Sequence, residues 1–413
     1  MSSLTTRMAL AALLLGSASP AWAGAGNGIR FGGSEGRLHP FLELEGRYDS
    51  NVYVNAFGTQ ASDFIVHTRP GLTLEVPGEL ATVELTAQLD WAKYLGADDA
   101  ATKDLSKLYA ESQLRVGVNE KGTVALLVED LFRRSDRPQA LSFNAGVISN
   151  FNDLSLAVPW HPGGGALAVT VNGGWSLETY QQFFSGFVCS GSTSPLCNTD
   201  NLSKLGYNEL RGGLEVRWKF LPRTAVVVSG GAFKRLPNDT AFSLDAAGYR
   251  AQAGLTGLIT PHVAATIEAG YGSTFSTTPS LGTWLLTADA EWLPTETASV
   301  KVGYAHDYAV DPGLLQTALY DVHRVFLDAK QQLAGRFTLK AKASLDRLGF
   351  AGSSADTVLL RAEPSVEAEA TRWLRFALAY AFTDRASSNQ AGFTLPARDY
   401  SKSEVWLKAV FTY

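Results

Sequence analysis

Long stretches in which apolar and polar side chains alternate are the feature that most restricts the fold of this chain. The stretch 81–91 reads Ala-Thr-Val-Glu-Leu-Thr-Ala-Gln-Leu-Asp-Trp, and the same alternation returns over 337–346, 374–382 and 404–413. Because side chains two residues apart share one face of a strand, each stretch predicts a strand that is apolar on one face only. Such stretches run for about 10 to 14 residues, whereas soluble strands average about half that length and membrane-crossing strands need about 9 to 11. Their length favours strands that cross a membrane.

The connections between these stretches alternate in length. Eight short turns, such as Pro77-Gly78 and Leu221-Pro222-Arg223, are separated by nine longer polar loops, of which 181–204 is the longest. Short turns on one side and long loops on the other are typical of bacterial outer-membrane barrels. Inside lipid an unpaired backbone group costs several kcal/mol, so the sheet must close on itself. We therefore expect an all-β fold: a closed antiparallel transmembrane β-barrel of about 18 strands, with short periplasmic turns and long extracellular loops.

The N-terminus has the pattern of a secretory signal. Arg7 precedes the apolar stretch Met8–Leu15, and Ala21-Trp22-Ala23 is a small-x-small cleavage site. A short membrane anchor is the alternative, but a membrane-spanning helix needs about 20 apolar residues. We expect a cleaved signal peptide at 1–23, a short periplasmic segment at 24–37 and a single barrel domain at 38–413.

The last strand carries an assembly signal. Val405, Leu407, Ala409, Phe411 and the terminal Tyr413 alternate with mostly polar residues. The ending resembles the aromatic C-terminal signal of outer-membrane barrels, with Phe411 and Tyr413 as the residues that the barrel-assembly machinery would read. A soluble β-sandwich could also end in this way.

Aromatic residues near strand ends are expected to form girdles at the two membrane interfaces, although packing in a soluble core is the alternative explanation. They are Trp91, Tyr94, Trp160, Trp218, Trp292 and Trp373.

Composition excludes several classes of protein. The chain has 35 basic and 40 acidic residues and only 2 Cys among 413 residues. This balance offers no basic surface for nucleic acid, and two cysteines cannot build a disulfide scaffold or a Cys-based zinc site. No cofactor-binding motif is present, so no cofactor is expected. Cys189 and Cys197 lie in the longest loop, where a loop-stapling disulfide is favoured over a metal or redox role.

The polar faces of the strands would line a water-filled lumen. About 14 residues precede the barrel, too few for the folded plug of a large energised transporter. Acidic and basic residues are mixed along the predicted lining, so a strongly ion-selective pore is not expected. Such a lining suits a neutral or modestly charged hydrophilic solute such as a sugar chain; the alternative is the ordinary solvated wall of any porin. The predicted pore-lining residues are Glu43, Glu45, Arg47, Arg69, Glu84, Asp90, Glu111, Arg115, Glu209, Arg211, Glu215, Arg217, Lys340, Lys342, Arg361, Glu363, Glu367, Arg375 and Lys408.

An enzyme is the third class of function to consider, because some outer-membrane barrels are hydrolases. His306 and His323 are expected near the extracellular end, beside Asp307 and Asp321. A hydrolase would need a nucleophile within reach of such a pair, yet no Gly-x-Ser-x-Gly motif accompanies them. We expect no enzymatic activity and no catalytic or metal-binding residues.

One resemblance to a known family rests on the first strands. The stretch 38–53 ends in Tyr-Asp-Ser-Asn-Val-Tyr, and 69–75 reads Arg-Pro-Gly-Leu-Thr-Leu-Glu. These segments resemble the start of an outer-membrane β-barrel porin family whose members recur with exopolysaccharide synthesis and export genes. The resemblance implies a channel that completes an export route, with a periplasmic polysaccharide-export protein as its partner.

The sequence therefore predicts a multi-pass channel in the outer membrane of a Gram-negative bacterium, surrounded by lipid and lipopolysaccharide, that secretes an exopolysaccharide. A general or nutrient-uptake diffusion porin is the first alternative, and an outer-membrane hydrolase active at the rim is the second. Polymer export predicts a wide polar lumen, a nutrient porin predicts a narrow eyelet, and a hydrolase predicts a cluster of His, Asp and Ser or Thr at the rim.

Overall fold

The computed structural model describes residues 28–30, 35–52, 54, 60–96, 106–136, 147–182, 203–241, 243–276, 280–310, 319–352, 356–388 and 399–413. The predicted signal peptide at 1–23 and the predicted Cys189–Cys197 disulfide lie outside these residues. Both stay predictions. Within the described part of the chain, no helix is long and apolar enough to span a membrane.

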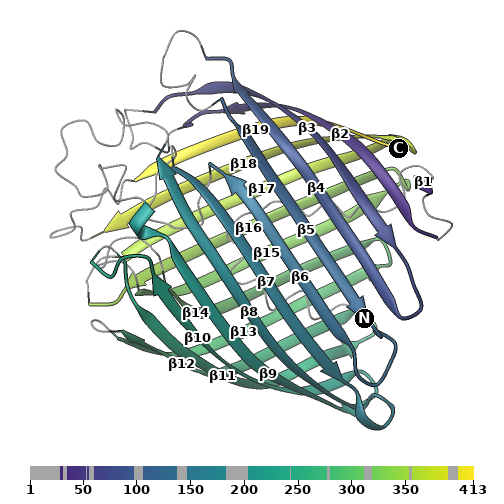
Figure 1. The fold of residues 1–413 in the computed structure, drawn as a ribbon, viewed down its shortest axis with the longest axis vertical. Coiled ribbons are helices and arrows are strands. Elements are labelled where there is room, and N and C mark those ends of the chain that lie inside the picture. The colour runs from purple at the N-terminus through teal and green to yellow at the C-terminus, as the bar shows by residue number, and fades with distance from the viewer. Residues whose placement is uncertain are drawn as a thin grey trace.

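Eighteen long strands, β2 to β19, form the barrel wall (Figure 1). They are β2 (Arg37–Asp49), β3 (Asp63–Val76), β4 (Ala81–Tyr94), β5 (Leu108–Val118), β6 (Leu126–Ser135), β7 (Val147–Trp160), β8 (Leu167–Gln182), β9 (Tyr207–Leu221), β10 (Thr224–Pro237), β11 (Ala246–Thr260), β12 (Val263–Ser276), β13 (Leu281–Thr295), β14 (Ala298–Val310), β15 (Leu319–Leu333), β16 (Phe337–Phe350), β17 (Asp356–Thr371), β18 (Leu374–Ser388) and β19 (Tyr400–Thr412). The remaining elements are the short strand β1 (Ile29–Arg30) and the 3-10 turns η1 (Pro162–Gly164) and η3 (Ser203–Leu205).

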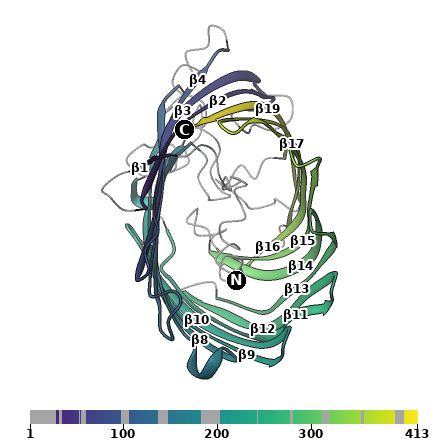
Figure 2. The ribbon, with the colours of Figure 1, turned by 90° about the vertical axis from the view of Figure 1, so that its right-hand side faces the viewer.

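Each strand pairs antiparallel with the next along the chain, and β19 pairs with β2 to close the ring (Figure 2). The closing ladder runs from Glu404 opposite Asp49 to Thr412 opposite Phe41. Beyond its end, the backbone N–H of Tyr413 donates to the carbonyl of Pro40 at 3.0 Å. The predicted fold class and strand number are confirmed. In the segment 24–37, which the sequence assigned to the periplasm, β1 adds a short pairing with the start of β2.

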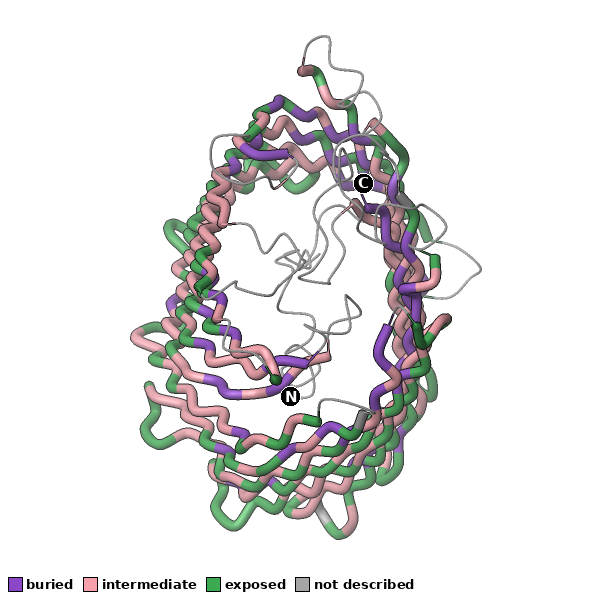
Figure 3. The backbone as a smooth tube through the Cα atoms, turned by 90° about the vertical axis from the view of Figure 1, so that its left-hand side faces the viewer, coloured by how far each residue is buried: buried purple, intermediate pink, exposed green. Residues whose placement is uncertain are grey.

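The two faces of the wall differ in chemistry, as the alternation predicted. Leu42, Leu44 and Tyr48 on β2 are exposed apolar residues, whereas the intervening Glu43 and Glu45 are buried. The same two-residue alternation of exposure recurs on other strands of the ring, among them β3, β10, β11 and β18 (Figure 3). Because successive side chains of a strand point to opposite faces, the apolar set faces lipid and the charged set faces the lumen.

Of the residues predicted to form the aromatic girdle, the tryptophans face outward, whereas one tyrosine faces inward. The tryptophans keep about half of their surface exposed and share the outward face with the apolar residues; they are Trp91, Trp160, Trp218, Trp292 and Trp373. Tyr94 lies three residues after Trp91 and pairs with the buried Ile65, so it faces the lumen. Its hydroxyl donates to Asp136 at 3.2 Å. Nearness to a strand end alone did not reveal which face Tyr94 occupies.

The pairing of β13 with β14 stops short of the extracellular ends of the two strands. The ladder between β13 and β14 ends at Leu286 opposite His306, and beyond it residues 281–285 pair only with β12 while residues 307–310 pair only with β15. The extracellular ends of β14 and β15 turn away from the wall into the ring (Figure 2). We call the point where β13 and β14 separate the fork, and residues 307–310 with 319–322 the infolded hairpin end.

Candidate functional site: the lumen wall and its infolded hairpin

All residues predicted to line the pore lie on the inward face by strand register. On β2 and β3, for example, Glu43 is opposite Arg69, and on β16 and β17 Lys342 is opposite Glu363. Their role in permeation stays a prediction. The structure shows which of these residues contact one another.

The largest ion-pair cluster lies where the barrel closes, across β19, β2, β3 and β4. Arg69 donates to Glu45 at 2.8 Å, contacts Asp90 at 2.9 Å and also pairs with Glu43. Lys408 on β19 reaches Glu43 on β2 at 2.9 Å, so an ion pair spans the closing ladder. The Glu45 side chain is 1% exposed and that of Arg69 10%. We call this group the seam cluster.

Other inward charges also occur in pairs. Arg324 donates two hydrogen bonds to Asp346, at 2.7 and 2.9 Å. Elsewhere on the wall, Lys340 pairs with Glu367 at 2.6 Å and Arg211 pairs with Asp153 at 2.5 Å. Because most of these charges have a partner of opposite sign, the wall is close to neutral on the scale of a few side chains. Such a wall gives no single-sign field that would select ions by charge.

Two arginines on the inner face of β10 and β11 bind the infolded hairpin end. Arg235 on β10 donates to the carbonyl of Val310 at 2.8 Å, although the two residues are 75 positions apart in sequence. Arg250 on β11 pairs with Asp307 at 3.1 Å. Both contacts join strands that are not neighbours in the ladder, so they fasten the hairpin end across the inner surface of β10 to β13.

Tyr308 anchors the hairpin end by packing. Its ring lies 6.5 Å from that of Phe233 and under the Arg250 guanidinium at 5.0 Å, and its hydroxyl donates to the carbonyl of Tyr249 at 2.9 Å. Gly272 makes this position possible, because a Cβ at residue 272 would lie 2.3 Å from a ring carbon of Tyr308. Tyr308 is 3% exposed, so the wall and the hairpin end are in close contact.

A small apolar core continues the contact. Leu244 and Ala246, just before and at the start of β11, pack with Leu319 at the start of β15, and all three are at most 3% exposed. Phe233, Leu281, Val310 and Ala351 pack around them. The infolded end is therefore seated by ionic, hydrogen-bonding and apolar contacts, and it occupies part of the lumen cross-section.

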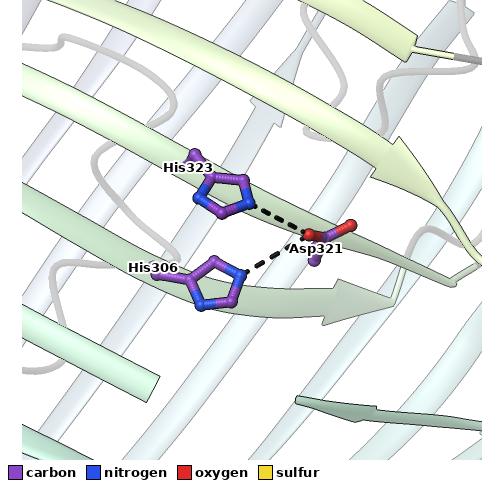
Figure 4. Close-up of side chains that lie close together, drawn as sticks. All are labelled: His306, Asp321 and His323. Atoms are coloured by element: carbon purple, nitrogen blue, oxygen red, sulfur yellow. Dashed lines mark hydrogen bonds and ion pairs between the residues drawn. The ribbon is translucent and has the colours of Figure 1, made fainter. Parts of the chain in front are cut away.

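The rim histidines meet as the alternation allowed. His306 and His323 are cross-strand partners on β14 and β15, and Asp321 lies two residues from His323 on the same face (Figure 4). Within the described residues, the hydrogen bonds of the two rings go to Asp321 and to Tyr304. Among these residues neither ring bonds a Ser or Thr hydroxyl.

Comparison with known families agrees with this architecture. The sequence profile of the family described as "Putative beta-barrel porin 2" matches residues 25–413, nearly the whole chain. The chain belongs to this porin family. Together with the closed barrel, membership places the porin in the outer membrane of a Gram-negative bacterium.

Three solved structures align with most of this chain. OpdK of Pseudomonas aeruginosa is 11% identical, with 91% of this chain and 99% of that chain covered and a TM-score of 0.47. OccAB4 of Acinetobacter baumannii is 11% identical, with 91% and 98% covered and a TM-score of 0.48. OccK9 (OpdG) of Pseudomonas aeruginosa is 14% identical, with 91% and 98% covered and a TM-score of 0.49. No curated protein gives a significant match.

Sequence reasoning missed the residues that seat the hairpin end. Arg235, Arg250 and Asp307 occupy inward positions on β10, β11 and β14, so extending the alternation through these strands would have added them to the predicted lining. No sequence signal marks Tyr308 as an anchor, since its contacts come from β10, β11 and β12.

Proposed function

We propose that this porin is a passive channel through which small hydrophilic solutes, such as short sugars, diffuse into the periplasm. The infolded end of β14 and β15 is the observation that carries the proposal, because it is fastened across the inner wall and reduces the lumen cross-section. A narrow section favours small solutes over a polymer chain, and the paired wall charges favour neutral or weakly charged ones.

A diffusion porin, the first alternative from the sequence, is thus proposed in place of an exopolysaccharide exporter. Export predicts a wide lumen, and the seated hairpin end argues against one. The export role and its periplasmic polysaccharide-export partner rest on the family resemblance alone and stay predictions.

The direct test is permeation through the purified porin in liposomes, measured by swelling in sugars of increasing size. Wild type should admit monosaccharides and exclude long oligosaccharides. The variant Tyr308→Ala, which removes the packing anchor without changing charge, should admit larger sugars and raise single-channel conductance, because pore diameter limits what passes. Tyr271→Ala, an exposed residue on the outward face of β12, is the matched control and should leave both unchanged.

A chromosomal in-frame deletion separates the two functions in cells. Unchanged surface polysaccharide with slower uptake of small sugars supports the diffusion porin. Loss of surface polymer that complementation restores, with unchanged sugar uptake, would overturn the proposal in favour of export.

A further inference from the structure

We propose that His306, Asp321 and His323 form a binding site for a divalent transition-metal ion of the zinc type on the outer rim of the barrel. The argument for this site does not use the proposed permeation role, although Asp321 belongs to the infolded hairpin end. It uses three side chains of one β14–β15 ladder, at the fork where β14 leaves β13.

The three donor atoms converge on one small volume. One ligand atom from each residue can be chosen so that all lie within 4.8 Å of one another. Nε2 of His306 lies 3.5 Å and Nε2 of His323 lies 3.3 Å from the same oxygen, Oδ2 of Asp321. In a tetrahedral zinc site with bonds of about 2.0 to 2.1 Å, neighbouring ligand atoms are about 3.3 Å apart. The two nitrogen–oxygen separations match that edge.

The same distances are long for a hydrogen bond. A charge-assisted N–H···O bond is usually about 2.7 to 2.9 Å, as the paired arginines of the wall show, whereas the two histidines keep Asp321 beyond 3.2 Å. Both ring nitrogens approach the same carboxylate oxygen of Asp321 (Figure 4). Two imidazoles and one carboxylate are the ligand set found in many zinc sites with an open fourth position.

Neighbouring side chains hold the ligands in this orientation. The hydroxyl of Tyr304 is hydrogen-bonded to Nδ1 of His323 at 2.7 Å, which leaves Nε2 directed at the site. Such a second partner fixes the ring and its tautomer, as it does for most metal-bound histidines. The His306 ring lies stacked on that of His323, with centroids 4.1 Å apart, and under Trp284 at 3.9 Å. His306 is 2% exposed and its ring is held in place, whereas the more exposed His323 ring must tilt out of this stack for the in-plane lone pairs of both rings to reach one ion.

Access is open on one side. The side chains of His323 and Asp321 keep 36% and 28% of their surface exposed, so an ion can enter from outside and keep a water ligand. Histidine nitrogens favour zinc, copper and nickel over magnesium and calcium, which prefer oxygen ligands. The site should therefore discriminate against the hard cations that bridge lipopolysaccharide.

The test uses the full-length porin, purified in detergent without a polyhistidine tag and titrated with zinc chloride in a calorimeter. Wild type should bind one zinc ion in excess Mg²⁺. Tyr304→Phe removes the hydrogen-bond partner of His323 and should weaken zinc affinity by a factor of about 10 to 100. Asp321→Asn and His323→Ala, which remove ligands, should each weaken zinc affinity at least as much. His161→Ala, an exposed histidine at the η1 turn, should bind like wild type.

A second readout does not depend on affinity. Copper(II) should quench the Trp284 indole that lies on His306, so the quenching step should disappear in Trp284→Phe and in Asp321→Asn. Retained heat-modifiable migration of each variant on gels shows that the barrel still folds. If folded Asp321→Asn and His323→Ala bind zinc as tightly as wild type, the site is not where we place it and the proposal fails.

Discussion

The seam, where β19 pairs with β2, and the fork, where β13 and β14 separate, differ in how the neighbouring strands are held together. At the seam, strands from the two ends of the chain meet, and a continuous ladder is backed by the buried cluster of Glu43, Glu45 and Arg69. At the fork, β13 and β14 are joined by a two-residue turn, yet their ladder stops at Leu286 and His306. Of these two strand pairs, the one that is close in sequence is the one that separates.

The difference indicates that sequence proximity does not decide where a barrel is tightly closed. The seam has no covalent connection, so its backbone pairs and buried charges must hold it. At the fork, a covalent turn joins β13 and β14 at their periplasmic ends. Their extracellular ends can therefore separate, and the end of β14 becomes part of the infolded hairpin end. We expect seam substitutions to change stability and fork substitutions to change permeation.

The largest effect should follow from removing a buried charge at the seam. Glu45→Ala leaves Arg69 and Arg47 with fewer partners in a buried site, and breaking such a cluster costs about 3 to 5 kcal/mol. The free energy of unfolding, measured by urea titration in lipid vesicles, should fall by that amount while conductance stays near wild type. Glu369→Ala, which removes an exposed partner 3.6 Å from Arg375, is the control and should cost less than about 1 kcal/mol. Equal losses in the two variants would contradict a special role for the seam.

Zinc binding at the fork should raise the free energy of unfolding by less than Glu45→Ala lowers it. A free zinc concentration 100 times the dissociation constant of the rim site should add about 2.7 kcal/mol to the free energy of unfolding. The gain should vanish in His323→Ala and persist in Glu45→Ala, because the two sites share no partner and distant effects add. A gain in His323→Ala equal to that in wild type would mean that zinc acts elsewhere.

Removing the hydroxyl of Tyr308 should have a still smaller effect on stability. Tyr308→Phe keeps the ring packing and loses the hydrogen bond to Tyr249, which is worth about 0.5 to 1.5 kcal/mol. We expect the hairpin end to leave the wall more often, which single-channel recordings would register as longer open events. Tyr271→Phe should behave like wild type in both measurements. Unchanged gating in Tyr308→Phe would indicate that packing alone seats the hairpin end.

The smallest effect is expected on the open wall, away from both regions. Arg115→Gln removes a half-exposed side chain 3.6 Å from Glu129, and exposed pairs contribute about 0 to 1 kcal/mol. The free energy of unfolding, measured by urea titration, should therefore change by less than it does in Tyr308→Phe. The change should be smaller still in high salt. A loss as large as that of Glu45→Ala would show that pairing, rather than burial, sets the cost.

Much of the architecture follows from residues that can be read locally. The stretch 81–91 predicted β4, and Pro77-Gly78 predicted the turn before it, because alternation and turn chemistry depend on neighbours in sequence. The inward charges, from Glu43 to Lys408, could be assigned to one face for the same reason. The rim histidines could be placed near one end of their strands but not brought together.

What the sequence by itself determined is therefore the barrel: the strands, their number, their two faces and the membrane they suit, all of which arise from a period of two residues and from strand length. Only the tertiary structure decided that the β13–β14 ladder stops at His306, that Tyr308 fits over Gly272, and that His306, His323 and Asp321 converge. These features depend on which strand lies opposite at a given level of the barrel and on how far a strand end can leave the wall. That information is a sum of many weak contacts between segments distant in sequence, and no single segment carries it.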